Sequence, residues 1–535
     1  MPEPIVEAEA VSASGSRKAR TIGVISIITV LVAVVGYFRE ATLAARFGIS
    51  TTMDAYFAAI FIPNIIYLVL IAGTLSPVFI PILMQETPDE DPEKASITFS
   101  VITNFALLVF VVIVSLGTIA ARLWLPVLFP GFNASTAELA VRLVYIIFPA
   151  LPFLAVAGIL TALLNGFHKF WLAAFAPAVA SLSVIAATLF LRGNRAIYAI
   201  AIATAIGFVL QCAVLLPATA CLRVRYQPIL DLRHPAIKKL LRLGVPLFLY
   251  LAVANASLVL ERNLASRISA GAVATLTYAL RLFTVPSNFL AAPLAIVAYP
   301  GFAREAVRER RGDLAGQVSR LFRLLVFVFL PITVWTILNA TPVTRILYEH
   351  GRFSAADSWI TARILAIYSF GIVANAVAVV LLRCYFAIED TVTPLLAELV
   401  DLVFFVTTAA ILTRRFGIEG LAAARSMTFF VVMIILTLVL GRRGLLKFSG
   451  FAQFLLRTAG ATVAMALTSW LIWHLVQPMF ESAGTLLRLA IIVLVICLSA
   501  TVFLGLAALF KLGESRQIIN TVLDLVPGLG RRGGE

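Results

Sequence analysis

Charged side chains inside long apolar stretches are the residues of this sequence that are best placed to do chemistry. A charge near the centre of a bilayer costs several kcal/mol unless it is paired or hydrated, so such residues are rare and usually functional. We single out eight such positions as candidates: Arg39, Glu40, Asp54, Glu261, Arg262, Arg281, Glu398 and Asp401. They are the candidate site residues, and the elements that must position them follow from the surrounding sequence.

Three of these residues are arginines, which suit phosphate. A guanidinium group donates bidentate hydrogen bonds to phosphate oxygens and keeps its charge at physiological pH. We expect Arg39, Arg262 and Arg281 to line one central cavity that accepts an anionic, phosphate-bearing amphiphile. The alternative is that Arg39–Glu40 and Glu261–Arg262 form local ion pairs that fix helix ends.

Two carboxylates, Glu398 and Asp401, are three residues apart and therefore share one face of a helix. They are candidates for binding a coupling Na⁺ or H⁺, and polar contacts between helices are the alternative. The sequence shows no P-loop, HExxH motif or nucleophile elbow. We therefore expect no other cofactor, no metal site and no enzymatic activity.

The histidines and cysteines also lack the spacing of a metal site or disulfide framework. We expect three histidines to lie in loops and the fourth to lie at the membrane interface: His168, His234, His350 and then His474. We expect the four cysteines to be small core residues: Cys212, Cys221, Cys384 and Cys497.

The composition places most of the chain in a membrane. Hydrophobic residues make up 61% of the 535 residues and charged residues 13%, whereas soluble domains average about 45–50% and about 25%. A bilayer-spanning helix needs about 20 apolar residues. The sequence therefore predicts an all-α polytopic membrane protein with fourteen spans, at 22–46, 54–84, 97–120, 139–166, 171–192, 196–222, 241–267, 272–300, 321–347, 358–387, 393–413, 418–440, 455–477 and 485–511.

The net charge of +15 comes from lysines and arginines in the short loops between these blocks. Cytoplasmic loops carry such an excess, so the charge indicates topology and argues against nucleic-acid binding. The distribution favours both termini in the cytoplasm, with cytoplasmic tails at 1–20 and 512–535.

An internal repeat divides the spans. At an offset of 223 residues, four arginine, glycine and proline positions match: Arg39 with Arg262, Gly48 with Gly271, Pro63 with Pro286, and Pro77 with Pro300. The repeat predicts two six-helix lobes, 21–222 and 223–441, related by a pseudo-twofold axis along the membrane normal, and a separate pair of helices at 442–511. This architecture suggests a transporter, and a duplicated scaffold without transport is the alternative.

Several short motifs carry a family resemblance over the first twelve predicted spans. The runs Gly36-Tyr37-Phe38-Arg39-Glu40, Ala45-Arg46-Phe47-Gly48, Asp54-Ala55-Tyr56, Ile62-Pro63-Asn64, Tyr278-Ala279-Leu280-Arg281-Leu282 and 386–394 (FAIEDTVTP) resemble the MurJ/MviN lipid II flippases. The resemblance implies the fold of the MOP exporter superfamily, which includes MATE transporters. It also implies export of a polyprenyl-pyrophosphate-linked sugar precursor of peptidoglycan, most simply lipid II, across the bacterial cytoplasmic membrane.

The resemblance extends to parts of the site. It implies that the helix pair at 442–511 forms a groove for the lipid tail, and that Arg39, Asp54 and Arg281 occupy functionally important positions. With the residues above, the predicted substrate-binding set is Arg39, Glu40, Asp54, Asn64, Arg262 and Arg281, and the predicted ion-coupling set is Glu261, Glu398 and Asp401. We expect a monomer, with membrane lipid and cell-wall synthesis proteins as partners.

The chain departs from the family pattern where the family carries further charges, at Ala33, Tyr67, Leu68 and Ala72. Three alternatives therefore stay open beside lipid II. They are another lipid-linked glycan as cargo, a MATE-like small-molecule exporter, and a non-transporting scaffold of cell-wall assembly.

Overall fold

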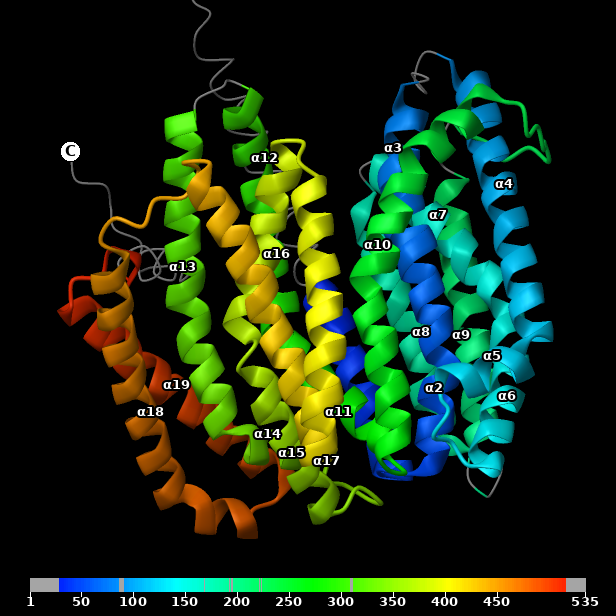
Figure 1. Ribbon diagram of the computed structural model, residues 1–535. Helices are drawn as coiled ribbons and strands as arrows, with labels where there is room; N and C mark the ends of the chain where they lie inside the picture. Colours follow the sequence, from blue (N-terminus) through cyan, green and yellow to red (C-terminus); the bar gives the residue numbers. More distant parts are fainter. Residues whose placement is uncertain are drawn as a thin grey trace, which may run out of the picture. The chain divides into compact units, whose positions relative to one another are not determined.

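The computed structural model describes residues 28–85, 91–167, 169–191, 193, 196–220, 222, 224–307 and 311–515. These residues form helices joined by short turns, and there is no strand among them (Figure 1). In a bilayer only helices and closed barrels satisfy every backbone hydrogen bond internally. The predicted all-α class is confirmed. The predicted tail 1–20, and all of 512–535 beyond residue 515, lie outside the described residues.

Twelve of the described helices are long and apolar enough to cross a membrane. A further pair, α15 (Ala355–Ser369) and α16 (Ile372–Ala387), qualifies as one crossing with a bend of 48°. The 51-residue α17 (Val392–Arg442) is interrupted by non-helical backbone at Gly417. At about 1.5 Å per residue it is long enough to cross a core of about 30 Å twice. Counted in this way, the described residues give fourteen crossings, at the predicted blocks.

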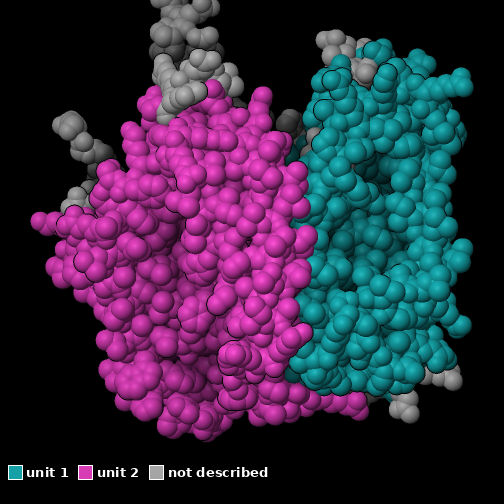
Figure 2. All heavy atoms as spheres, viewed as in Figure 1, with its two compact units in different colours: residues 1–274 teal, residues 275–535 magenta. Residues whose placement is uncertain are grey.

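The chain divides into two compact units at Ala274–Thr275 (Figure 2). Unit 1 begins with a helix over Ile28–Phe47. It continues with α2 (Thr51–Ile66), η1 (Tyr67–Leu75), α3 (Ser76–Met84), α4 (Pro92–Ile119), α5 (Ala121–Leu128), α6 (Ala134–Ile147), η2 (Phe148–Ala150), α7 (Leu151–Gly166), α8 (Phe170–Phe190), α9 (Ala196–Thr219) and α10 (Pro235–Ile268). Within it α9 packs on both α7 and α8, and α2 packs on α6.

Unit 2 takes over within α11 (Ala272–Pro286). It continues with η3 (Ser287–Ala291), α12 (Ala292–Val307), α13 (Arg311–Leu338), α14 (Ala340–Tyr348), α15, α16, α17, α18 (Phe451–Ser482) and α19 (Thr485–Leu509). Within it α16 packs on α12, α13 and α17. The C-terminal helices α18 and α19 pack on each other, and α18 also packs on α13.

The boundary between the units lies after α10, whereas the repeat places the lobe boundary at 222/223. The segment before α10 explains the difference, because it is tied to α4 by hydrogen bonds. The amides of Arg225 and Gln227 donate to the hydroxyls of Ser96 and Ser100, and the Asn104 amide donates to the carbonyl of Ile229 at 2.7 Å. This strap, residues 224–229, holds α10 against η1, α3 and α4. The lobes as units of duplication remain a prediction.

The repeat is visible in the local backbone. Pro63 lies inside α2 and Pro286 ends α11, and each is followed by a π-helix, η1 and η3. Proline removes one helical hydrogen bond, and π-turns are a usual adjustment of a helix around such an interruption. Gly48 and Gly271, just before these helices, have φ of 59° and 83°. These left-handed conformations favour glycine, which accounts for the matched glycines of the two halves.

Close approach of α8 and α9 generates a stability prediction. A Cβ added at Gly207 would lie 2.9 Å from the Cα of Ala180, which the backbone must move to relieve. We expect Gly207→Ala to destabilise the protein by about 1–3 kcal/mol, the usual cost of overpacking. Gly505→Ala in α19 meets nothing within 4 Å and is the matched control. Thermal unfolding in detergent should show a lower Tm for the first variant only, and equal Tm values would contradict the close approach.

Candidate functional site

The first predicted arginine is held by its neighbour in the helix over Ile28–Phe47. The Nη2 of Arg39 lies 2.7 Å from the Oε1 of Glu40. The Glu40 side chain is almost fully buried, and the Arg39 side chain is 20% exposed. This is the local ion pair that the sequence offered as the alternative to a phosphate site. The Arg39 side chain is therefore only partly accessible from the protein surface.

Asp54 binds the start of another helix. It lies in the first turn of α2, which Ser50 caps by accepting from the amide of Met53. The buried carboxylate of Asp54 accepts hydrogen bonds from the amides of Gly271 at 2.5 Å and Ala274 at 2.8 Å. The first amides of a helix have no partner within it and carry a partial positive charge. Asp54 therefore acts as a cap for α11, supplied from a distant part of the sequence.

Arg262 holds the same turn between α10 and α11. Its Nη1 donates to the carbonyl of Val273 at 3.0 Å, and its guanidinium lies 5.9 Å from the centre of the Phe61 ring. Its side chain is buried, as is that of the neighbouring Glu261. We call Asp54, Arg262 and the backbone they bind, residues 271–274, the α10–α11 clamp.

The remaining predicted substrate residues, Asn64 and Arg281, are exposed. Asn64 lies in α2 of unit 1 and Arg281 in α11 within unit 2. The structure thus brings Asp54 and Arg262 together in unit 1. The expectation that Arg39, Arg262 and Arg281 line one cavity stays a prediction.

Asp401 of the predicted acidic pair in α17 forms an ion pair with Arg425, a residue that was not predicted from the sequence. Nη1 of Arg425 lies 4.0 Å from Oδ2 of Asp401, and their side chains are only 12% and 6% exposed. The guanidinium also lies 5.7 Å and 5.4 Å from the ring centres of Phe405 and Phe429. The signal for Arg425 was present in the sequence, because it is one of two charged residues, with Glu419, in the apolar block 418–440.

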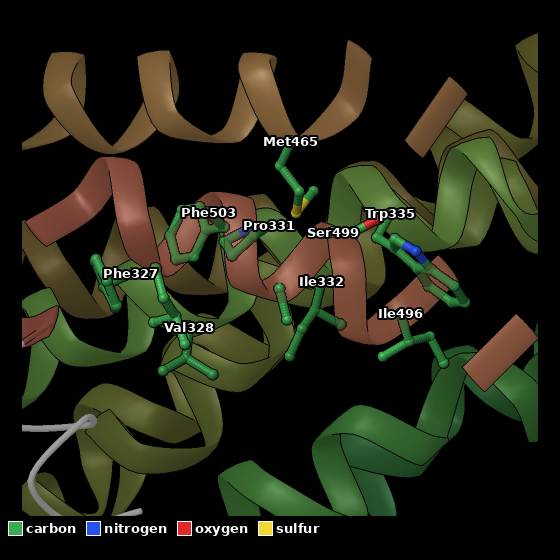
Figure 3. Close-up of a pocket in the computed structure, with 11 residues that line it drawn as sticks. Phe327, Val328, Pro331, Ile332, Trp335, Met465, Ile496, Ser499 and Phe503 are labelled. Carbon is green, nitrogen blue, oxygen red and sulfur yellow. The ribbon is translucent and has the colours of Figure 1, made fainter. Parts of the chain in front are cut away.

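An apolar cavity of about 260 Å³ lies between α13, α18 and α19 (Figure 3). Pro331 and Trp335 of α13, Met465 of α18 and Phe503 of α19 line it, and Ser499 is the one lining residue with a polar side-chain oxygen. The helix pair for which the resemblance implied a lipid-tail groove thus contributes two of the three walls.

Among the described residues the histidines share no site, and no group of three or more His, Cys, Asp or Glu there could hold a metal ion. His234 caps α10, and His474 stacks on Trp470. His168 and Cys221 lie outside the described residues. Cys212 and Cys384 are buried, but the prediction of a core position is wrong for Cys497, which is exposed. Its helix, α19, has exposed apolar residues along most of its length. In a bilayer, lipid is a favourable surrounding for such side chains, so a small apolar residue need not be buried in the protein.

The turn between α16 and α17, within the motif 386–394, is held by one carboxylate. Asp390 accepts from the backbone amide and hydroxyl of Thr393 at 2.9 Å and 2.6 Å and from Nη1 of Arg443 at 2.6 Å. Burial alone would raise the pKa of Asp390, but the hydrogen bonds from Thr393 and Arg443 outweigh it and lower the pKa. The turn is thereby tied to the end of α17.

Removal of the Asp54 carboxylate should loosen the α10–α11 clamp. In Asp54→Ala two buried amides lose their acceptor, at a cost of about 1–3 kcal/mol for each unsatisfied group. Asp54→Asn keeps one carbonyl oxygen and should lose less. Thermal unfolding of the purified protein should rank the Tm values as wild type, then Asp54→Asn, then Asp54→Ala. An alanine variant as stable as the wild type would contradict the capping role.

The Asp390 turn should give a pH-dependent contribution to stability. Because the folded state lowers this pKa, the contribution is complete above the ordinary value of 3.8 and is lost as the pH falls through the folded value. The Tm difference between wild type and Asp390→Asn should stay constant from about pH 8 to about pH 5 and shrink below about pH 4. A difference that does not change down to about pH 3 would contradict the assignment.

Comparison with known proteins agrees with this architecture. The family model described as "Lipid II flippase MurJ" matches residues 43–495. The "Lipid II flippase MurJ" of Burkholderia cenocepacia is 29% identical over 460 residues, which cover 84% of this chain and 88% of the relative. The "Probable lipid II flippase MurJ" of Rhizobium tropici is 27% identical, with coverage of 89% and 91%.

Solved structures share the fold. The structure titled "Lipid II flippase MurJ, inward closed conformation" has a TM-score of 0.77 at 24% identity and covers 92% of this chain and 99% of its own. An inward-facing multidrug resistance MATE family transporter of the MOP superfamily has a TM-score of 0.60 at 18% identity, with coverage of 78% and 98%. Since the family model matches most of the residues from the first span to the last, this multi-pass membrane protein belongs to the lipid II flippase MurJ family.

Proposed function

We propose that this protein flips lipid II across the bacterial cytoplasmic membrane for peptidoglycan synthesis, as a transporter and not as an enzyme. The observation that carries the proposal is family membership over residues 43–495, which include nearly all of the membrane spans. The MATE likeness concerns the fold alone.

The chemistry of the cargo fits the described groups. A lipid-linked sugar pyrophosphate has an anionic head that cannot enter about 30 Å of hydrocarbon unaided, and a tail that is at home there. Arginine binds phosphate oxygens in bidentate fashion, and the side chains of Arg281, which is exposed, and Arg39, which is partly exposed, fit this role. The apolar cavity between α13, α18 and α19 offers a wall for the polyprenyl tail.

The transport cycle follows from separate binding of the anionic head group and the apolar tail. The protein alternates between access to the two membrane faces, with the arginines on the pyrophosphate and the tail kept in apolar surroundings. Both termini lie in the cytoplasm, in keeping with the positive charge of the loops. The protein works as a monomer and delivers its cargo to cell-wall synthesis proteins.

Complementation of a flippase-depleted bacterium tests the function and the head-group site together. The wild type should restore growth, and Arg281→Ala should lower flipping by about tenfold to a hundredfold, since hydrogen bonds to charged groups contribute about 1.5–3 kcal/mol. Arg142→Ala is the matched control, because Arg142 pairs with Glu138 on α6 and both side chains are more than half exposed. Failure of a well-expressed wild type would count against lipid II as cargo. Full activity of both Arg281→Ala and Arg39→Ala would remove the phosphate-binding role.

A second set of variants in the same assay tests the lipid-tail wall. Ala500→Trp places an indole ring into the cavity that Ala500 lines, so it should impair growth without loss of expression. Thr501→Trp adds the same ring at the next position, which is exposed and does not line the cavity, and should be tolerated. Equal growth of the two variants would exclude the cavity from the transport path.

A further inference from the structure

The acidic pair in α17 poses an electrostatic problem. Glu398 and Asp401 are one helical turn apart inside a membrane-spanning segment, where each unpaired charge costs several kcal/mol. Two carboxylates in such a place require positive charge. A coupling cation is one source of it, as the sequence analysis expected.

Positive charge is already present on the same element. Arg425 forms an ion pair with Asp401 at 4.0 Å, with both side chains mostly buried. Glu398 lies within electrostatic range of both Asp401 and Arg425. The guanidinium thus pairs with one carboxylate and acts on the other through space, and arginine keeps its charge under all physiological conditions.

The surroundings of this cluster do not suit a metal ion. Hard cations such as Mg²⁺ and Ca²⁺ are bound by about six or more oxygen ligands, and Na⁺ likewise favours oxygen donors. Here the guanidinium of Arg425 lies against the rings of Phe405 and Phe429, which offer no oxygen but stabilise an organic cation through their faces. A metal ion placed at Asp401 would also be repelled by Arg425. The residues present therefore fit a guanidinium and not a coupling ion.

We propose that Arg425 is a built-in cation that takes the place of a coupling metal ion at Glu398 and Asp401, so that this site does not respond to Na⁺. Arg425 is a positioning residue: it links the part of α17 before the break at Gly417 to the part after it. The significance for transport rests on the proposed flippase function, because an occupied site leaves the cycle without sodium coupling at this point.

The test measures stability and not transport, so it gives a result whether or not lipid II is the cargo. The purified full-length protein is unfolded by heat in sodium, potassium and choline chloride at equal ionic strength. The wild type should have the same Tm in all three salts. Arg425→Gln leaves two carboxylates without their cation and adds an amide oxygen. It should therefore unfold at a lower temperature in potassium and choline, and sodium should raise its Tm by a few degrees.

Two control variants separate the ion site from a general loss of packing. Arg425→Lys keeps a cation and should be insensitive to sodium, as should Arg425→Gln combined with Asp401→Asn, which removes the excess negative charge. Arg363→Gln breaks a more exposed ion pair to α17, Arg363–Glu419, and should show no selective response to sodium.

Two results would overturn the proposal. One is selective stabilisation of the wild type by sodium, which needs no variant to be observed. The other is an Arg425→Gln protein that folds but responds equally to the three salts.

Discussion

The absence of water from the bilayer interior is the constraint on which the rest of this structure depends. Each backbone amide, carbonyl and charge inside the membrane must find a partner within the protein. Hydroxyl groups in the spans accordingly turn back onto their own helices, as Thr188 does to Val184 and Thr204 to Ile200. The same need explains why a carboxylate of α2 caps α11, since the start of that helix has no solvent to bind its amides.

The partners of each arginine within the spans show which of two roles it has, and the residue type alone does not. An arginine in an apolar helix is able to bind a substrate phosphate or to complete the protein's own hydrogen bonds. Arg262 and Arg425 make internal contacts, to a backbone carbonyl and to a carboxylate. Arg39 is intermediate, and Arg281 is exposed. Its exposed side chain makes Arg281 the most accessible of these arginines to cargo.

The fold was largely predictable because its signals are local. Apolar block length defines the spans, and the matched Gly48–Gly271 and Pro63–Pro286 pairs mark the same turns and π-helices in both halves. The site was less predictable, because partners such as Asp54 with residues 271–274 are more than 200 residues apart in the sequence. Arg425 was missed since its role depends on the chain reversing at Gly417. The position of the unit boundary after α10 was equally hard to predict, because it depends on hydrogen bonds between serine and asparagine side chains of α4 and the backbone of the strap.

The strap has a consequence for how such a chain is assembled in a membrane. The repeat predicts a six-span lobe as the unit of duplication, but the first compact unit contains seven crossings, because α10 packs with the residues that precede it. An odd number places the two ends of that unit on opposite sides of the bilayer. We therefore expect unit 1 to complete its packing during synthesis only after α10, the first helix of the second predicted lobe, has been inserted. The predicted unit of duplication and the compact unit thus differ by one helix, α10, which belongs to the second repeat by sequence and to the first unit by packing.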